Sequence, residues 1–146
     1  MMTSEGDHVL VVDDDELDTK LFLQSLEPFG AVATCFDRAF EAISYVESDV
    51  WLASGIQLVL LDWKMPGTGA GVLEAIRKSP ALRFTPVVVL SRSGEETDIR
   101  AAYEAGANAY VVKGNDLDEI ERDMKLLYGF WLEVGNAPSG AVQSPW

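Results

Sequence analysis

The sequence predicts an α/β fold, a three-layer sandwich in which a five-stranded parallel sheet is covered by helices on both faces. Five short apolar runs rich in Val, Ile and Leu recur along the 146 residues. Between them lie stretches whose apolar residues have the 3.6-residue spacing of amphipathic helices. Apolar runs without alternation suit strands buried on both faces, and strands that alternate with helices form right-handed βαβ units. The sheet is therefore expected to be parallel.

The predicted elements follow one another in a regular order. The strands cover residues 9–12, 31–36, 56–61, 86–90 and 109–112. The helices present these apolar faces, in chain order: Leu17, Leu21, Phe22, Leu26 and Phe29; Phe40, Ile43 and Val46; Val72, Leu73 and Ile76; Ile99, Ala102 and Tyr103; and Leu117, Ile120, Met124 and Leu127. Asp15 is placed to cap the first helix, Pro80 follows the third, and Gly106 lies where the fourth should end.

Composition narrows the function. A chain of 146 residues that is 48% hydrophobic is expected to form one domain with a sizeable core. Its formal net charge of −13 argues against direct nucleic-acid binding, which depends on Lys and Arg. No run of ~18 apolar residues is present and the first residues are acidic, so we expect a cytoplasmic protein with no membrane segment. One cysteine, Cys35, and one histidine, His8, exclude a Cys/His zinc site, and Cys35 is expected to be a buried hydrophobe.

The last predicted helix continues further than a five-stranded sheet requires. Its apolar spacing runs on from Leu127 to Trp131, so Phe130, Trp131 and Leu132 form an apolar group with no predicted cover. We therefore divide the chain into an N-terminal tail (1–7), a compact domain (8–128) and a C-terminal extension (129–146), which consists of an arm and a flexible tail.

Acidic residues follow two of the predicted strands. Asp13 and Asp14 come directly after the first strand, and Asp62 ends the third. In the flavodoxin-like strand order 2-1-3-4-5, these strands flank the switch point where ligands bind, so folding should bring the three carboxylates together. An Asp after a strand often only caps the next helix, but three at a switch point favour a cation site. Oxygen ligands without Cys or His suit Mg²⁺, and without a cation the crowded acids should have raised pKa values.

Two further strand ends add a hydroxyl and an ammonium. The fourth strand ends near Ser91 and the fifth near Lys113. Beside a metal-bound carboxylate, these groups would offset the charge of a phosphoryl group carried by Asp62. On its own, Lys113 would be an ordinary solvated lysine, and its position gives it this role.

Four motifs resemble the receiver domains of two-component response regulators. They are Val11-Val12-Asp13-Asp14-Asp15, Leu60-Leu61-Asp62-Trp63-Lys64-Met65-Pro66-Gly67, Val88-Val89-Leu90-Ser91 and Gly106-Ala107-Asn108-Ala109-Tyr110-Val111-Val112-Lys113. The motifs stand in register over about residues 8–128. The resemblance implies a phosphorelay protein whose Asp62 accepts a phosphoryl group from a sensor histidine kinase. Such a protein promotes only its own phosphorylation and dephosphorylation and is not otherwise an enzyme.

The resemblance also assigns roles within the site. It implies that Mg²⁺ is held by Asp14, Asp62 and the backbone carbonyl of Lys64, with Asp13 acting through water. It implies that Ser91 and Tyr110 form a switch pair. On phosphorylation the Ser91 hydroxyl turns toward the phosphoryl group and Tyr110 moves into the vacated space, which remodels the face made by the fourth helix, fifth strand and fifth helix.

The C-terminal extension resembles that of stand-alone receivers paired with bacterial phytochrome kinases, through Phe130-Trp131-Leu132-Glu133 followed by Pro138. This resemblance implies a bacteriophytochrome-type partner and a homodimer formed through the face of the fourth and fifth helices and a C-terminal arm. Leu127, Phe130 and Trp131 are the expected interface residues, because exposed apolar patches mark interfaces. The alternative is that Trp131 folds back onto its own domain.

Several positions depart from the family pattern. Gly114 follows Lys113 where many receivers have a proline after a cis bond, so we expect either a trans bond with a rearranged loop or a strained bond. Arg92 replaces the small residue that usually follows the switch hydroxyl, and it either restricts access to the phosphoryl group or pairs with it. Lys64 and Ser93 occupy positions that tune dephosphorylation in the family.

The main alternative function is a pseudo-receiver that serves as a phosphorylation-independent binding adaptor. The intact set of Asp14, Asp62, Ser91 and Lys113 counts against it, because an adaptor needs none of them. A phosphatase with a nucleophilic Asp would need a second acid where Lys64 stands. A dinucleotide site is not expected in residues 67–72, because a valine occupies the last glycine position and the first strand ends in acids.

Overall fold

The computed structural model describes residues 7–48, 55–65 and 68–135. Its sheet consists of five parallel strands: β1 (His8–Val12), β2 (Val32–Phe36), β3 (Leu58–Asp62), β4 (Val87–Ser91) and β5 (Ala109–Val112). Their order is β2-β1-β3-β4-β5, which confirms the predicted flavodoxin-like arrangement. Most of the predicted N-terminal tail (1–6), the last two residues of the second motif (66–67) and the C-terminal tail (136–146) lie outside the described residues, as do residues 49–54.

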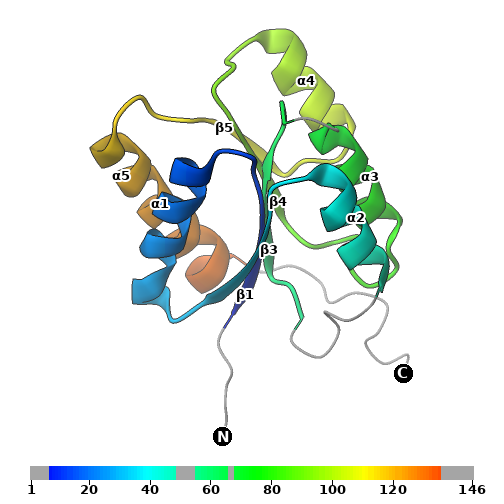
Figure 1. Ribbon diagram of the computed structural model, residues 1–146, viewed down its shortest axis with the longest axis horizontal. Helices are drawn as coiled ribbons and strands as arrows, with labels where there is room; N and C mark the ends of the chain where they lie inside the picture. The colour runs from blue at the N-terminus through cyan, green and yellow to red at the C-terminus, as the bar shows by residue number, and fades with distance from the viewer. Residues whose placement is uncertain (1–6, 49–54, 66–67, 136–146) are drawn as a thin grey trace, which may run out of the picture.

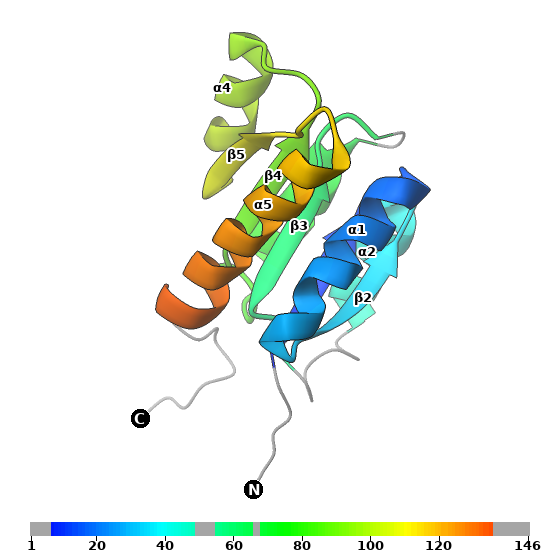
Figure 2. The same cartoon turned by 90° about the vertical axis from the view of Figure 1, so that its left-hand side faces the viewer.

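Five helices alternate with the strands. They are α1 (Glu16–Leu26), α2 (Ala39–Ser48), α3 (Gly69–Lys78), α4 (Glu96–Glu104) and α5 (Leu117–Tyr128). Short 3₁₀ and π-helical segments, Glu27–Phe29 and Gly129–Val134, continue α1 and α5. Seen along the edge of the sheet, α1 and α5 cover one face, while α2, α3 and α4 lie on the other (Figure 1). A quarter turn brings α1 and α5 in front of the sheet, where they lie side by side (Figure 2).

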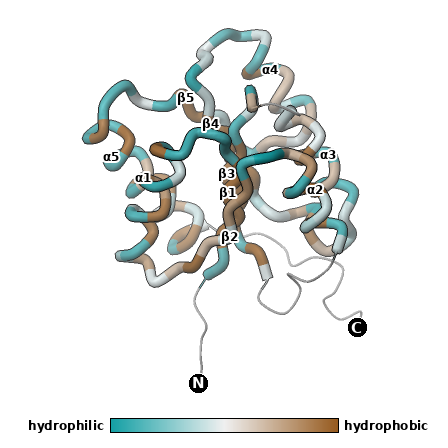
Figure 3. The backbone as a smooth tube through the Cα atoms, in the orientation of Figure 1, coloured by the Kyte–Doolittle hydropathy of each residue, from teal (hydrophilic) through white to brown (hydrophobic). Residues whose placement is uncertain are grey.

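Each face of the sheet has its own hydrophobic core. Alternate residues of a strand point to opposite faces, so Val9 and Val11 join the core under α1 and α5, and Leu10 and Val12 join the one under α2 and α3. Brown, hydrophobic backbone is concentrated in the central strands (Figure 3). Burial on both faces, as predicted, holds for the central strands β3 and β4, every residue of which is buried.

The edge strands correct that prediction. In β2 and β5 all residues are half-buried or exposed, because each strand has a neighbour on one side only. Cys35, which was expected to be buried, is exposed for the same reason. Short apolar runs of the sequence do not distinguish a central strand from an edge strand, since both are rich in the same residues.

The first helix is rotated relative to the prediction. Leu17, which was assigned to the apolar face of this helix, is 58% exposed, and Asp18 lies on the buried face instead. Asp18 shares that face with Phe22, Ser25 and Leu26, at the spacing of one side of a helix. Asp15 caps the helix as expected, since its side chain accepts a hydrogen bond from the Asp18 N–H at 2.9 Å.

The C-terminal extension packs on its own domain in this structure. The π-helical segment continues α5, and its residues Trp131 and Leu132 are half-buried against the core that contains Leu127 and Tyr128. The Tyr128 hydroxyl donates a hydrogen bond to the Phe22 carbonyl at 3.0 Å and ties α5 to α1. The expectation that this apolar group has no cover is therefore wrong for Trp131 and Leu132, because the helix does not leave the domain after residue 128.

Among the described residues, none of the helices is long and apolar enough to cross a membrane. The longest of them, α5, has 12 residues and carries several charged side chains. A transmembrane helix needs about 20 apolar residues.

Candidate functional site

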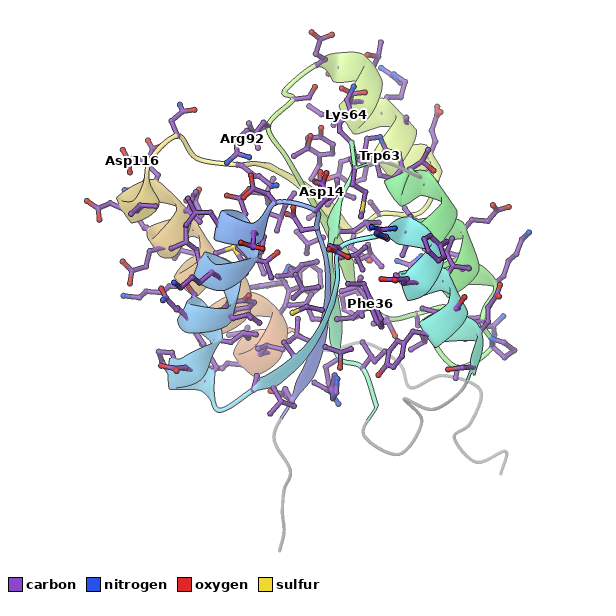
Figure 4. The ribbon with its side chains drawn as sticks, in the orientation of Figure 1. Asp14, Phe36, Trp63, Lys64, Arg92 and Asp116 are labelled. Carbon is purple, nitrogen blue, oxygen red and sulfur yellow. The ribbon has the colours of Figure 1, made fainter. Side chains whose placement is uncertain are left out.

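Three carboxylates meet at the carboxyl edge of the sheet. Asp13 and Asp14 follow β1, Asp62 ends β3, and the pairing of Val12 with Leu61 puts these strand ends at one level. One oxygen from each carboxylate lies within 4.8 Å of the others, which confirms the predicted cluster. Asp13 and Asp62 are buried, whereas Asp14 is exposed, so the cluster opens to solvent on the side of Asp14. Figure 4 shows Asp14 at this edge, above the carboxyl end of β1.

The electrostatics of the cluster follow from this crowding. Burial raises the pKa of Asp62 to about 7, with a further contribution from the nearby Asp13, although the charge of Lys113 acts in the opposite direction. Burial likewise raises the pKa of Asp13, although Lys113 and the Asp15 N–H act against it. The site is therefore short of positive charge. The ligand atoms that the cluster offers are carboxylate oxygens, and this donor set fits a hard divalent cation that keeps part of its water shell.

The backbone beside Asp62 is fixed on both sides. The Lys64 N–H donates to Asp62 Oδ1 at 3.2 Å, which holds the segment after β3 against the carboxylate. Gly69 lies so close to this strand end that a Cβ there would come within 2.6 Å of the Asp62 carbonyl oxygen. A glycine is thus required for α3 to begin directly beside the site.

Lys113 reaches the cluster from the end of β5. Its Nζ lies 2.9 Å from Asp13 Oδ2, 2.9 Å from Asp18 Oδ2 and 3.9 Å from Asp62 Oδ2. The chain from Lys113 to Gly114 is trans, since the described residues contain no cis peptide bond. A Cβ at Gly114 would lie 2.7 Å from the Cβ of Glu119, so the loop that follows Lys113 has room only for glycine here. Of the two expectations for this bond, the trans form with a different loop is the one observed.

The two expected switch residues are connected through the segment after β4. Ser91 is buried, and its hydroxyl oxygen accepts a hydrogen bond from the Ser93 N–H at 3.1 Å. The Tyr110 hydroxyl donates to the Ser93 carbonyl at 2.7 Å. Ser93 Oγ also donates to Asp98 of α4, and Asp98 pairs with Lys64 at 3.2 Å. Ser93 is therefore the residue through which Ser91, Tyr110 and α4 are joined.

Asp18 is the site residue that sequence reasoning missed. Its side chain, 2% exposed, accepts hydrogen bonds from Lys113 at 2.9 Å and from Arg92 at 3.0 and 3.1 Å. Burial alone would raise its pKa, yet the hydrogen bonds from Arg92 and Lys113 hold the pKa below its usual value. One feature of the sequence could have indicated this position. Asp18 lies four residues before Phe22, so the two side chains lie on the same face of the helix, and burial of Phe22 implies burial of Asp18.

The Arg92 side chain forms ion pairs with residues at the start of α1. Its guanidinium contacts Asp18 and lies 4.0 Å from Asp15, so it reaches from the segment after β4 to the start of α1 (Figure 4). Its side chain is 56% exposed. Neither sequence-based expectation for Arg92 included this pair.

The chain is similar to a group of signalling proteins. The family described as response regulator receiver domain matches residues 9–125. The probable methanogenesis regulatory protein FilR2 of Methanothrix harundinacea is 29% identical over 151 residues, spanning 86% of this chain and 97% of that protein. Among solved structures, the phosphorylated cyanobacterial phytochrome response regulator RcpA has a TM-score of 0.85 and 30% identity, covering 92% of this chain and 100% of RcpA. The Mn²⁺-bound form of Rcp1, from Synechocystis, has a TM-score of 0.81 and 28% identity, covering 91% of this chain and 99% of Rcp1.

Proposed function

The chain belongs to the response regulator receiver domain family, and from that premise we propose that it is a single-domain regulator that accepts a phosphoryl group on Asp62 from a sensor histidine kinase. One observation carries this proposal. Asp62 ends a buried strand with two further carboxylates within 4.8 Å and the Lys113 ammonium 3.9 Å from its Oδ2. A carboxylate that is close to a cation but not hydrogen-bonded to it remains available as a nucleophile.

The transfer is a simple displacement. An oxygen of Asp62 attacks the phosphorus of a phosphohistidine, so that an O–P bond forms and the P–N bond breaks. The imidazole of the kinase leaves and takes up a proton. Lys113 offsets the charge of the phosphoryl oxygens during this step, since its ammonium is preorganised beside the acceptor.

Mg²⁺ is the proposed cofactor. Asp14, Asp62 and the backbone carbonyl of Lys64 would hold it, with Asp13 acting through water. The oxygen-only donor set and the raised pKa of Asp62, about 7, support a divalent cation at this edge. When bound, the ion supplies positive charge that offsets the phosphoryl oxygens. The Lys64 N–H donates a hydrogen bond to Asp62 Oδ1 at 3.2 Å, which keeps the backbone of Lys64 next to the acceptor.

Phosphorylation is proposed to act through Ser91 and Tyr110. If the Ser91 hydroxyl turns toward the phosphoryl group, it gives up the hydrogen bond from the Ser93 N–H. Ser93 in turn holds the Tyr110 hydroxyl and Asp98 of α4. A change at Ser91 therefore reaches both β5 and α4, and we expect it to remodel the α4–β5–α5 face.

The proposed kinase is of the phytochrome type, and the proposed assembly is a homodimer. The similarity to the phytochrome response regulator RcpA supports the first. Exposed apolar residues on α4, β5 and α5, namely Tyr103, Val112 and Leu117, support a contact through this face. Of the expected arm residues, Leu127 is buried and Trp131 half-buried within one copy, so Phe130, 50% exposed, would make the contact.

A transfer assay tests the function and the partner together. The autophosphorylated kinase region of a bacterial phytochrome is mixed with the protein and Mg²⁺, with a kinase of another sensor class and Asp62→Asn as controls. We expect rapid transfer from the phytochrome kinase to the wild type alone. Binding without transfer would favour the adaptor alternative instead.

The dimer has its own test. In sedimentation velocity, Phe130→Ala should shift the protein toward monomer, because this side chain is exposed and its loss leaves the core intact. Phe84→Ala removes an exposed aromatic side chain from the segment between α3 and β4 and serves as the matched control. An unchanged mass for Phe130→Ala would contradict the arm contact.

A further inference from the structure

Asp18, a buried carboxylate that is not one of the predicted site residues, binds two cationic side chains next to the site, Lys113 and Arg92. Asp18 lies in the first turn of α1, and its Oδ2 accepts hydrogen bonds from both Lys113 Nζ at 2.9 Å and Arg92 Nη1 at 3.0 Å. Its Oδ1 accepts from Arg92 Nη2 at 3.1 Å. Both oxygens are therefore occupied, and the side chain is fixed between β5 and the segment after β4.

The geometry around Lys113 explains what this contact does. An ammonium has three N–H donors. Asp13 and Asp18 accept two of them, each at 2.9 Å, whereas Asp62 Oδ2 lies at 3.9 Å, beyond hydrogen-bond distance. The third donor is thus left on the side of Asp62. Lys113 is held beside the nucleophile without covering it.

We propose that Asp18 is a positioning residue for phosphoryl transfer, which holds the Lys113 ammonium off the Asp62 nucleophile and leaves its third N–H for the incoming phosphoryl oxygen. This inference rests on the proposed function of Asp62 as the phosphoacceptor. Asp18 touches neither the reacting oxygen nor the proposed metal ligands by any contact of the described residues. It acts through Lys113.

The consequence of losing Asp18 follows from the charges that remain. Lys113 is buried, and its other close carboxylates are Asp13 and Asp62. Without Asp18, the ammonium closes the 3.9 Å gap and hydrogen-bonds to Asp62. The oxygen that must attack phosphorus is then occupied, so phosphoryl uptake slows.

Arg92 secures Asp18 from the opposite side. Its two nitrogens contact the two oxygens of the carboxylate, in the forked geometry that arginine forms with carboxylates. This two-point contact fixes the orientation of the Asp18 carboxylate. Because the Arg92 side chain is more than half exposed, its removal leaves the Asp18–Lys113 contact in place and serves as the matched control.

The test is a double-mutant cycle on the rate of phosphoryl uptake from acetyl phosphate at saturating Mg²⁺. We expect Asp18→Asn to slow uptake at least ~10-fold, since misplacing a positioned group by about 1 Å can cost ~100-fold. Arg92→Gln should change the rate far less. In a Lys113→Ala background, Asp18→Asn should have no further effect, because the residue through which it acts is gone.

A second readout separates positioning from damage to the fold. Mg²⁺ affinity, measured by calorimetry, should change much less than the uptake rate in Asp18→Asn, whereas a distorted site would lose both. The inference is overturned if Asp18→Asn matches the wild-type rate, or if it slows uptake equally in the Lys113→Ala background. A wild type that takes up no phosphoryl group overturns the proposed function, and this inference with it.

Discussion

Two buried carboxylates lie against the same ammonium and behave in opposite ways. Asp18 accepts hydrogen bonds from Lys113 and Arg92, and despite its burial these bonds keep its pKa below the usual value. Among the described residues, the cation nearest to Asp62 is Lys113 at 3.9 Å, beyond hydrogen-bond distance, and burial raises the pKa of Asp62 to about 7. Asp18 lies 2.9 Å from the Lys113 nitrogen and 3.0 Å from Arg92, whereas Asp62 lies 3.9 Å from the Lys113 nitrogen. Asp13, which is also 2.9 Å from Lys113 but among the described residues has no contact with Arg92, has a raised pKa, so the second cation is what distinguishes Asp18.

The difference shows how the fold divides its acids between structure and chemistry. A paired carboxylate stabilises the fold and is a poor nucleophile, because its lone pairs are engaged. A buried carboxylate whose cation lies beyond hydrogen-bond distance costs stability, but it remains available for a metal and a phosphoryl group. The same lysine serves both, so changes at either acid should have effects of opposite sign on stability.

The largest expected effect is the loss of Asp18. Asp18→Ala should lower the free energy of unfolding by about 3 kcal/mol, because it leaves the buried Lys113 with one fewer partner. Since folding lowers the pKa of Asp18, its contribution is present above the unfolded value of 3.8 and is lost as the pH falls through the lower folded pKa. Urea denaturation at pH 7 and in acid measures this. A loss of stability that did not shrink in acid would contradict the ion-pair explanation.

The next effect has the opposite sign. Asp62→Asn should raise the free energy of unfolding by about 1–2 kcal/mol at pH 8, because it removes a buried charge that the Lys113 ammonium, 3.9 Å away, offsets only in part. Folding raises the pKa of Asp62 from 3.8 to about 7, so the cost of its charge grows as the pH rises across that interval and is absent below it. The stabilisation should therefore be smaller at pH 5 than at pH 8. Equal stabilisation at both values would show that charge is not its cause.

The sequence predicts the cluster that contains Asp62, but it does not predict the position of Asp18. The ends of apolar runs locate strand ends, so the meeting of Asp13, Asp14 and Asp62, with Ser91 and Lys113 nearby, follows from the strand order. The position of Asp18 depends on the rotation of α1. Apolar residues at Leu17, Leu21 and Phe22 allow more than one buried face, and packing selects the one that excludes Leu17.

Two other misjudged residues have the same kind of cause. Cys35 was expected inside because its neighbours are apolar, but its strand lies at the edge of the sheet. Trp131 was expected without cover because it lies beyond the compact domain, but the π-helical segment after α5 packs this side chain against the core of the domain, which covers it in part. In both cases the burial of the side chain depends on which element lies next to it in the fold, and the local sequence does not give that information.

A bound divalent cation should reduce the stability cost of the Asp62 charge, and with it the contrast between Asp62 and Asp18. At a Mg²⁺ concentration ten times its dissociation constant, the wild type should gain about 1.4 kcal/mol of stability. Asp62→Asn should gain less at the same concentration, because its amide offers the ion no charge. Thermal unfolding with and without Mg²⁺ checks this, and an equal gain for both proteins would place the cation elsewhere.

The smallest effect is expected at Arg92. Its side chain is more than half exposed, and exposed ion pairs contribute at most about 1 kcal/mol. Arg92→Gln should therefore lower stability by less than Asp18→Ala, because Asp18→Ala also leaves the buried Lys113 with one fewer partner. Urea denaturation of the two variants side by side measures the ratio. A larger loss for Arg92→Gln would contradict the claim that the buried Asp18–Lys113 contact contributes more to stability than the exposed Asp18–Arg92 contact.

The most direct test of the account is the intact mass of the protein after incubation with Mg²⁺ and acetyl phosphate, for the wild type, Asp62→Asn and Asp18→Asn. We expect one phosphoryl group on the wild type, none on Asp62→Asn at any time, and slow but eventual uptake by Asp18→Asn. Uptake by Asp62→Asn at the wild-type rate would contradict the claim that the Asp62 carboxylate is the acceptor.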